Sequence, residues 1–365
     1  MPVKVGVAED NHPYRVRGGN LKLGASTDDS LSNSVSAPRR LRMRRLFQYS
    51  LRTLLILTTL VACAVGWWSY TARSQREAVA AIVSVQGSVL YDFQFQKLNK
   101  PAYWPAWLVD VLGVDYFSDV QMVSLINAND VGVGLKHLRN LTALRHLALT
   151  YTDVRDADLK NLKGLAELTS LHLDGTKISD AGLEQLRERK ALTELHLFGT
   201  RVTDAGIAHL EGLTRLQTLV LDGTEVTDAG LIHLAGLSNL QKVGLESTHI
   251  TDAGLIHLKG LSALQLLSLR KTHITGSGLK SLHGKTKLEI LWLGNAPITN
   301  IGLQEVQYLT SLKSLDLSGS DVTDAGLEHL TGLKSLQTVY LANLNITEAG
   351  LARLQQALPH CKIYR

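Results

Sequence analysis

The chain has 365 residues, of which 45% are apolar and only 5% aromatic, and it contains two cysteines. The apolar fraction excludes a wholly disordered chain, and two cysteines exclude a disulfide framework or a cysteine-rich zinc fold. The formal net charge of +5 comes from residues 1–45, which hold nine Lys/Arg and four Asp/Glu, whereas residues 120–365 hold 24 of each. The large C-terminal part therefore has no basic surplus with which to attract nucleic acid.

Residues 1–45 predict a disordered, basic N-terminal tail. The tail is rich in Ser, Asn and Asp without an apolar period, and five arginines fall within the seven residues 39–45. An apolar segment comes immediately after it, so the arginine run reads as the flank of a membrane segment rather than as a nucleic-acid site.

Residues 46–70 predict a transmembrane signal-anchor helix. No charged residue lies between Thr53 and Trp68. A helix from Leu51 to Tyr70 would span about 30 Å, the thickness of a bilayer core. Because far more arginines precede this segment than follow it closely, the positive-inside rule predicts a cytoplasmic N-terminus and an extracytoplasmic C-terminal part in a single-pass inner-membrane protein.

A lipoprotein is a second interpretation of the same segment. Leu60-Val61-Ala62-Cys63 resembles a bacterial lipobox, and a start at Met43 instead of Met1 would give a short basic leader before Cys63. Apolar residues continue past Cys63, which favours the anchor over cleavage and lipidation at that cysteine.

Residues 71–119 predict a juxtamembrane helix and an N-terminal cap for a repeat array that begins at Val120. Residues 72–85 have a helical pattern, residues 88–93 could form a strand, and Trp104 and Trp107 flank or begin a short apolar helix. Aromatic side chains before a repeat array are typical of a cap, because the first repeat has no preceding unit on which to stack.

From Val120 the chain repeats every 24 residues in ten units, without insertion or deletion. A typical unit begins Leu216-x-x-Leu219-x-Leu221 and continues to Thr227-Asp228-Ala229-Gly230-Leu231. The alternating leucines predict a strand with Leu219 and Leu221 in the core, and the later leucines predict a short helix with Thr227 or Asp228 as its N-cap.

This pattern resembles the leucine-rich repeat. The resemblance implies an α/β solenoid, or horseshoe, whose parallel β-sheet is concave and whose short helices are convex, preceded here by one transmembrane helix. The Thr-Asp-Ala-Gly-Leu core resembles a subclass found in F-box adaptors and bacterial repeat proteins. Phe47-Gln48-Tyr49-Ser50 and Asp115-Tyr116-Phe117 resemble segments of membrane-anchored repeat proteins of planctomycete-type bacteria. Residues 71–119 contain no F-box-like module, so a role in ubiquitination is not implied.

One polar position recurs after each strand, where many leucine-rich repeats have Asn or Cys. The sequence predicts a ladder of hydroxyl groups that satisfies loop backbone groups, formed by Thr152, Thr176, Thr200, Thr224, Thr248 and Thr272. Ser320 can take part, whereas Ala128, Ala296 and Leu344 cannot. Ile363 keeps the strand phase, so residues after 359 predict a half-repeat as the C-terminal cap, which completes the repeat domain at 120–365.

The sequence predicts no catalytic, cofactor-binding or metal-ligating residues, and therefore a protein that is not an enzyme. No phosphate loop, dinucleotide fingerprint or hydrolase motif is present in the sequence. Five histidines share one position on the predicted outer helix face and are interpreted as solvated repeat residues: His137, His209, His233, His257 and His329.

The variable concave face is the candidate binding surface. The candidate ligand-binding residues are His172, His196, Phe198, Asp222, Glu246, Leu266, Arg270, Ile290, Trp292, Asp316 and Tyr340. Within this set, Leu266, Ile290 and Trp292 predict an apolar cluster, because neighbouring strands lie about 4.8 Å apart. A polar sector with the two histidines and nearby carboxylates lies beside it.

These features predict membrane-anchored recognition of a protein or peptide, with a glycan as a further possible partner. A structural or self-associating envelope protein is the alternative, and an inverted topology would make the chain a cytoplasmic scaffold. An enzyme with a site near His172 and His196 lacks a supporting nucleophile or acid/base set.

Overall fold

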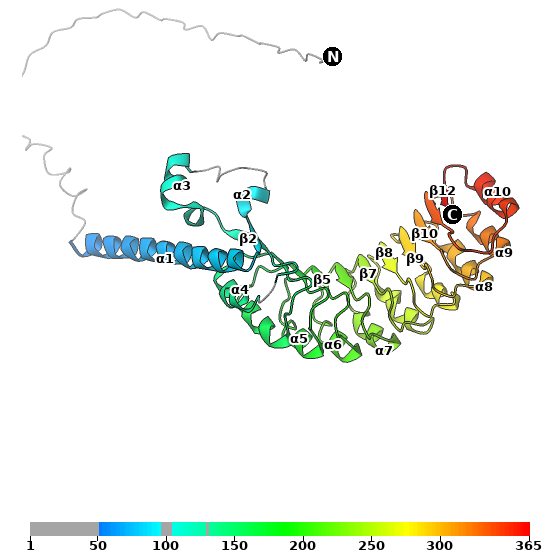
Figure 1. Ribbon diagram of the computed structural model, residues 1–365, viewed down its shortest axis with the longest axis horizontal. Coiled ribbons are helices and arrows are strands. Elements are labelled where there is room, and N and C mark those ends of the chain that lie inside the picture. Colours follow the sequence, from blue (N-terminus) through cyan, green and yellow to red (C-terminus); the bar gives the residue numbers. More distant parts are fainter. Residues whose placement is uncertain (1–50, 96–103, 129–130) are drawn as a thin grey trace, which may run out of the picture. The chain divides into compact units, whose positions relative to one another are not determined.

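The computed structural model describes residues 51–95, 104–128 and 131–365. The expected tail at 1–45, with its arginine run, lies outside the described residues. The segment Val61–Arg365 forms one compact unit. Within it the strands form one sheet on the concave side and the short helices lie on the convex side (Figure 1).

The sheet has twelve described strands, and their spatial order follows their order in the chain. They are β1 (Ser88–Tyr91), β2 (Val120–Ser124), β3 (His146–Ala148), β4 (Ser170–His172), β5 (Glu194–His196), β6 (Thr218–Val220), β7 (Lys242–Gly244), β8 (Leu266–Ser268), β9 (Ile290–Trp292), β10 (Ser314–Asp316), β11 (Thr338–Tyr340) and β12 (Lys362–Tyr364). Strands β2 to β12 pair in parallel at a constant offset of 24 residues, as in Leu195 with Leu219. The predicted repeat phase is therefore confirmed as the strand register.

The convex side carries short α-helices and 3₁₀ helices. The α-helices are α4 (Gly132–His137), α5 (Asp180–Glu184), α6 (Asp204–Ala208), α7 (Asp228–Leu231), α8 (Asn300–Leu303), α9 (Asp324–Leu327) and α10 (Glu348–Ala357). The 3₁₀ helices are η3 (Leu138–Asn140), η4 (Asp156–Leu162), η5 (Ile232–Leu234), η6 (Gly254–Gly260), η7 (Ser277–Leu282), η8 (Gln304–Tyr308) and η9 (Glu328–Leu330). Where the sequence predicted one helix per repeat, a single α-turn often passes directly into a 3₁₀ turn.

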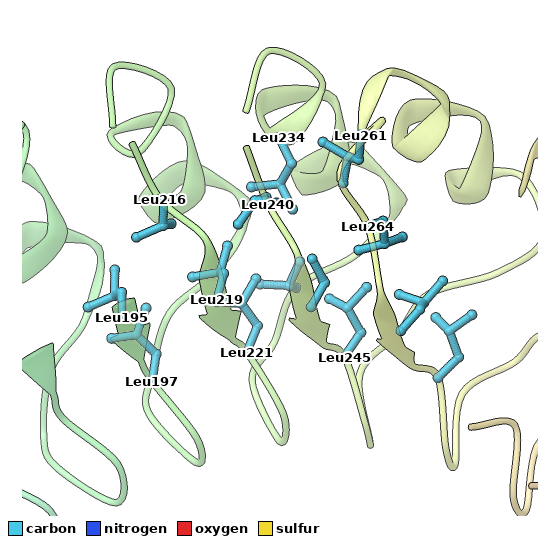
Figure 2. Close-up of a cluster of buried hydrophobic side chains, with 14 of the residues drawn as sticks. Leu195, Leu197, Leu216, Leu219, Leu221, Leu234, Leu240, Leu245, Leu261 and Leu264 are labelled. Carbon is cyan, nitrogen blue, oxygen red and sulfur yellow. The ribbon is translucent and has the colours of Figure 1, made fainter. Parts of the chain in front are cut away.

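The leucines of successive repeats form one continuous core. Leu219 and Leu221 have no exposed surface, as the strand pattern predicted, and Leu216 and Leu234 meet them from the loop and the convex helix. Figure 2 shows this stacking from one repeat to the next. One repeat cannot bury these side chains alone, so each unit depends on its neighbours for stability.

The predicted Thr ladder is confirmed at six positions. In each case the hydroxyl donates to the carbonyl oxygen three residues earlier at 2.6–2.8 Å, from Thr152, Thr176, Thr200, Thr224, Thr248 and Thr272. Ser320 does not extend the ladder, contrary to expectation. Its hydroxyl is the one buried side-chain polar atom among the described residues that has no hydrogen-bond partner.

A second ladder, formed by carboxylates, links the convex sides of adjacent repeats. Asp204 accepts hydrogen bonds from the Thr227 backbone N–H at 2.8 Å and from the Thr227 hydroxyl at 2.6 Å. In five more repeats an aspartate accepts the same pair of hydrogen bonds, from the N–H and the hydroxyl of the Ser or Thr 23 residues later: Asp156, Asp180, Asp228, Asp252 and Asp324. A Cβ atom on Gly230 would lie 2.5 Å from the Asp204 Oδ1 atom, so glycine makes room for the carboxylate. This geometry explains the Thr-Asp-Ala-Gly sequence.

Thr227, and not Asp228, is the N-cap of helix α7. Its hydroxyl oxygen accepts from the Ala229 N–H while its hydroxyl proton goes to Asp204. The same threonine thus caps its own helix and ties it to the preceding repeat.

The turn after each strand requires a left-handed backbone. One residue per repeat has φ between 53° and 68°, and this residue directly precedes the ladder position: Asn127, Tyr151, Gly175, Gly199, Gly223, Ser247, Lys271, Asn295, Gly319 and Asn343. Glycine and asparagine tolerate this conformation, whereas Tyr151, Ser247 and Lys271 adopt it at a cost in conformational energy.

The N-terminal cap covers the open edge of the parallel sheet. Helix α1 (Leu51–Ser84) continues without a break past residue 70, where the sequence suggested a boundary, and buries Ala72, Ala78 and Ile82. Strand β1 then pairs antiparallel with β2. Gln75 also contributes, because its side-chain oxygen accepts from the Val120 N–H and its amide donates to the Ser118 carbonyl.

Three short elements complete this cap: α2 (Asp92–Phe95), α3 (Ala106–Leu112) and η2 (Val114–Tyr116). The Trp68 indole N–H donates to the Tyr116 carbonyl at 2.9 Å, and the Trp68 ring packs edge-on against Tyr116 and Phe117. At the other end β12 pairs in parallel with β11, and Ile363 lies opposite Val339.

Candidate functional site

The concave face presents side chains from one sheet in fixed register. In parallel strands that lie side by side, equivalent positions form files that run across the repeats. Leu266 lies opposite Ile290, and Trp292 lies between Ser268 and Asp316. The structure therefore brings the predicted residues of β8 to β10 together.

A mixed apolar and charged group, here called the Trp292 cluster, consists of Leu266, Arg270, Ile290, Trp292 and Asp316. The Arg270 guanidinium lies 4.6 Å from the centre of the Trp292 ring. It also contacts Asp316 at 2.8 Å through Nε and at 2.6 Å through Nη2. One arginine thus stacks on the tryptophan and bonds to the carboxylate, which fixes both planar groups.

Asp316 differs from the expectation of an exposed carboxylate. Its residue is only 4% exposed, and its Oδ1 atom accepts from the Ser318 N–H. Arg270 covers it from the concave side. Asp316 therefore positions Arg270, while the half-buried Trp292, Ile290 and Leu266 offer the accessible apolar surface.

The histidine sector lies on β4 and β5. The rings of His172 and His196 stack with their centres 4.0 Å apart and their planes 11° apart. Glu194 lies beside both, with Oε1 3.0 Å from His196 Nε2 and 3.7 Å from His172 Nε2. The Ser170 hydroxyl donates to Glu194 Oε2 at 2.8 Å. Glu194 and Ser170 were not among the predicted site residues, although both occupy the outward position two residues after a repeat begins.

Burial and the neighbouring His196 lower the pKa of His172, against the opposing attraction of Glu194 and Asp174. Burial alone would raise the pKa of Glu194, but the Ser170 hydrogen bond and the two histidines hold it below its ordinary value. The sector therefore combines a carboxylate with a neutral imidazole at neutral pH.

The carboxylates of Asp174 and Asp222 accept hydrogen bonds from backbone N–H groups of the next repeat. An Asp222 carboxylate oxygen accepts from the Glu246 N–H, as Asp174 does from the Phe198 N–H at 2.9 Å. A Cβ atom on Gly244 would lie 2.6 Å from Asp222, so glycine again makes room for a carboxylate. Burial, with the nearby charges of Glu246 and Asp174, raises the pKa of Asp222 to about 6 despite the Glu246 hydrogen bond.

Two aromatic side chains of the predicted set remain open on this face. Phe198 is 42% exposed and Tyr340 is 37% exposed. Tyr340 stacks on Tyr364 of the C-terminal cap with ring centres 5.0 Å apart. The predicted site residues therefore form several separate groups along the sheet rather than a single pocket.

The convex histidines occupy the expected helix positions, but all five are half-buried rather than fully solvated. His233 approaches Glu211 of the preceding unit. Among the described residues, none of the five belongs to a group of three potential metal ligands, whereas His172 and His196 do.

Comparison with known proteins identifies the repeat. The family model described as Leucine Rich repeat matches residues 167–186 and 308–330. Among curated proteins no match was found.

Two solved structures from Listeria monocytogenes resemble the chain. An internalin is 26% identical, covers 63% of this chain and 69% of its own, and has a TM-score of 0.50. An internalin C2 is 29% identical, covers 57% of this chain and 84% of its own, and has a TM-score of 0.43. The 24-residue register, the family-model matches and the likeness to the first internalin together show a leucine-rich-repeat solenoid fold.

Proposed function

We propose that this chain is a membrane-anchored recognition protein that binds a protein or peptide through the concave face. The Trp292 cluster is the observation that carries the proposal. A tryptophan that lies under an arginine, which is itself held by a buried carboxylate, presents a rigid amphipathic surface. Tryptophan and arginine are the residues most often found at the energetic centre of protein interfaces, and rigid side chains lose little entropy on binding.

The surroundings of the cluster fit an extended partner. Phe198 follows β5, three strands before the first strand of the cluster, and Tyr340 on β11 lies opposite Asp316 of the cluster; both are exposed. Between them lie polar groups such as Glu246, which pairs with Lys271 at 2.9 Å. A row of separate apolar and charged contacts across many strands suits a polypeptide better than a small molecule.

Helix α1 would supply the anchor. It is long and apolar enough to cross a membrane, and its most apolar stretch is not buried against the rest of the chain. Trp67, Tyr70 and Trp107 are at least 66% exposed. Exposed aromatic residues that follow an apolar stretch of helix are typical of the bilayer interface.

We further propose that the chain belongs with the membrane-anchored repeat proteins of bacteria, as the Thr-Asp-Ala-Gly-Leu repeats and the segments flanking the apolar helix suggest. The similarity to a bacterial internalin supports the bacterial part of this proposal. The recognition face would then lie outside the cytoplasmic membrane.

The binding face is tested with Trp292→Ala combined with Ile290→Ser in the full-length chain, in its native membrane. Partners are recovered by crosslinking and co-purification. The matched control is Ile301→Ser, an 82% exposed residue on the convex helix α8 of the same repeat. We expect the concave variant to lose the partner and the convex control to keep it, with equal unfolding midpoints. Recovery of the same partner by the concave variant would contradict the proposal.

The topology is tested by protease treatment of spheroplasts that carry a C-terminally tagged chain. Loss of the tag without lysis supports an extracytoplasmic repeat domain. Protection of the tag until lysis would instead indicate a cytoplasmic scaffold. A mature chain that begins at Cys63 would identify the lipoprotein, and contacts only between copies of the chain would favour self-association.

A further inference from the structure

Three potential metal ligands converge on the concave face at β4 and β5. His172 projects from β4, and Glu194 and His196 project from the same side of β5, two residues apart. One nitrogen or oxygen atom from each lies within 4.8 Å of the other two. His172 and His196 are direct partners in the strand register, so the sheet itself sets this arrangement.

The donor spacing fits a tetrahedral metal ion. Metal–ligand bonds of 2.0–2.1 Å place neighbouring tetrahedral ligands about 3.3 Å apart. The Glu194 Oε1 atom lies 3.0 Å from His196 Nε2 and 3.7 Å from His172 Nε2, which brackets this value. The stacked rings would tilt toward the shared ion, and their partial exposure leaves room for that movement.

Neighbouring side chains would orient the ligands. Asp174 Oδ2 lies 3.9 Å from His196 Nδ1, the nitrogen that would remain free when Nε2 binds an ion. The other oxygen of Asp174 is held by the Phe198 N–H, and Ser170 holds the second oxygen of Glu194. A carboxylate behind a ligating histidine and a hydrogen bond to a ligating carboxylate are common features of protein metal sites.

We propose that His172, Glu194 and His196 bind one divalent transition-metal ion of the zinc class. Two imidazoles and one carboxylate select against Mg²⁺ and Ca²⁺, which prefer all-oxygen sites. Three protein ligands leave at least one coordination position for water or for a side chain of a bound partner. This inference goes beyond the proposed function, since it requires neither the Trp292 cluster nor the membrane anchor.

The test is calorimetric titration of Zn²⁺ into the full-length chain, purified in detergent and stripped of metal with a chelator. Absorption spectra of the Co²⁺-loaded chain report the coordination geometry. We expect one Zn²⁺ per chain and a tetrahedral Co²⁺ spectrum. His172→Ala, His196→Ala and Glu194→Gln should each weaken binding at least tenfold.

The matched control is His249→Ala, which breaks another stacked histidine pair. The ring centres of His249 and His273 lie 6.3 Å apart, and the pair is not part of a three-ligand group among the described residues. The affinity of the His249→Ala variant for Zn²⁺ should equal that of the wild-type chain. Zn²⁺ affinity that is unchanged in the His172 and His196 variants, with unfolding midpoints intact, would overturn the proposal. A stoichiometric site that is lost with His249 would overturn it as well.

Discussion

Asp204→Ala should destabilise the repeat array through the loss of one step of the carboxylate ladder. The Asp204 side chain accepts two hydrogen bonds from Thr227, at 2.8 Å and 2.6 Å. Hydrogen bonds to charged groups contribute about 1.5–3 kcal/mol each, and partial exposure lets water replace part of that. We therefore expect a loss of about 2–3 kcal/mol, concentrated at the contact between two repeats.

The chain contains its own control for this prediction. Asn300 occupies the ladder position in a later repeat, where its oxygen accepts from the Thr323 N–H and its amide donates to the Thr323 hydroxyl, both at 2.9 Å. Asp204→Asn can form the same pair of contacts and should cost less than about 1 kcal/mol.

The assay is thermal unfolding of the full-length chain in detergent, followed by far-UV circular dichroism. For 150–250 residues, a loss of 1 kcal/mol lowers the midpoint by about 2–4 °C, so Asp204→Ala should lower it by about 4–12 °C. Asp204→Asn should remain within about 4 °C of the wild-type chain on the same scale. An unchanged midpoint for the alanine variant, or equal losses for both variants, would refute the role assigned to the paired hydrogen bonds.

Three further predictions concern single positions. Ser247→Gly should raise the unfolding free energy by about 0.5–1 kcal/mol, because Ser247 adopts φ 55° where glycine is unstrained; a decrease in chemical denaturation would contradict this. Ser320→Thr should add about 1 kcal/mol, since threonine at the equivalent positions donates to the carbonyl three residues earlier, and an unchanged denaturation midpoint would argue against it. Asp222→Asn should be more stable than the wild-type chain above pH 6 and equally stable below about pH 4. The pKa of Asp222 is raised in the folded chain, so the wild-type side chain stabilises the fold most when it is protonated, and this contribution is lost as the pH rises through about 6. The rise of the Asp222 pKa from 3.8 to about 6 corresponds to at most about 3 kcal/mol of unfolding free energy, and partial exposure reduces the expected gain to about 1 kcal/mol. A gain in stability that is equal at pH 4 and pH 8 would contradict the electrostatic cause.

The 24-residue period predicted the solenoid architecture because the same positions are buried in each repeat. Leu219 and Leu221 each recur every 24 residues, and that recurrence is also the strand register. The Thr ladder followed from a polar residue at one fixed position in a leucine-rich unit. The C-terminal cap could likewise be predicted, because Ile363 keeps the phase of the strands.

The contacts between repeats were not predictable in the same way. The sequence suggested Thr227 as a helix cap, but its bond to Asp204 joins residues 23 apart and depends on how tightly the units stack. The left-handed turn could have been found, because glycine or asparagine holds that position in seven of ten repeats.

The concave side chains were placed on the correct face, but their partners were not foreseen. The pairing of Arg270 with Asp316 spans two repeats and buries a carboxylate that was expected to be open. Glu194 similarly gains its importance only from its position between two histidines. Side-chain directions within a file depend on such local pairings, which a periodic pattern does not contain.

Contact between the concave face and the partner is tested most directly by a photoreactive amino acid in the membrane-bound, full-length chain. It is placed at Phe198 and Tyr340 on the concave face and at Ile256 and Ile301 on the convex face. All four side chains are at least 37% exposed. We expect the same crosslinked partner from both concave positions and from neither convex position. Crosslinks that form only from the convex positions would contradict recognition through the concave face.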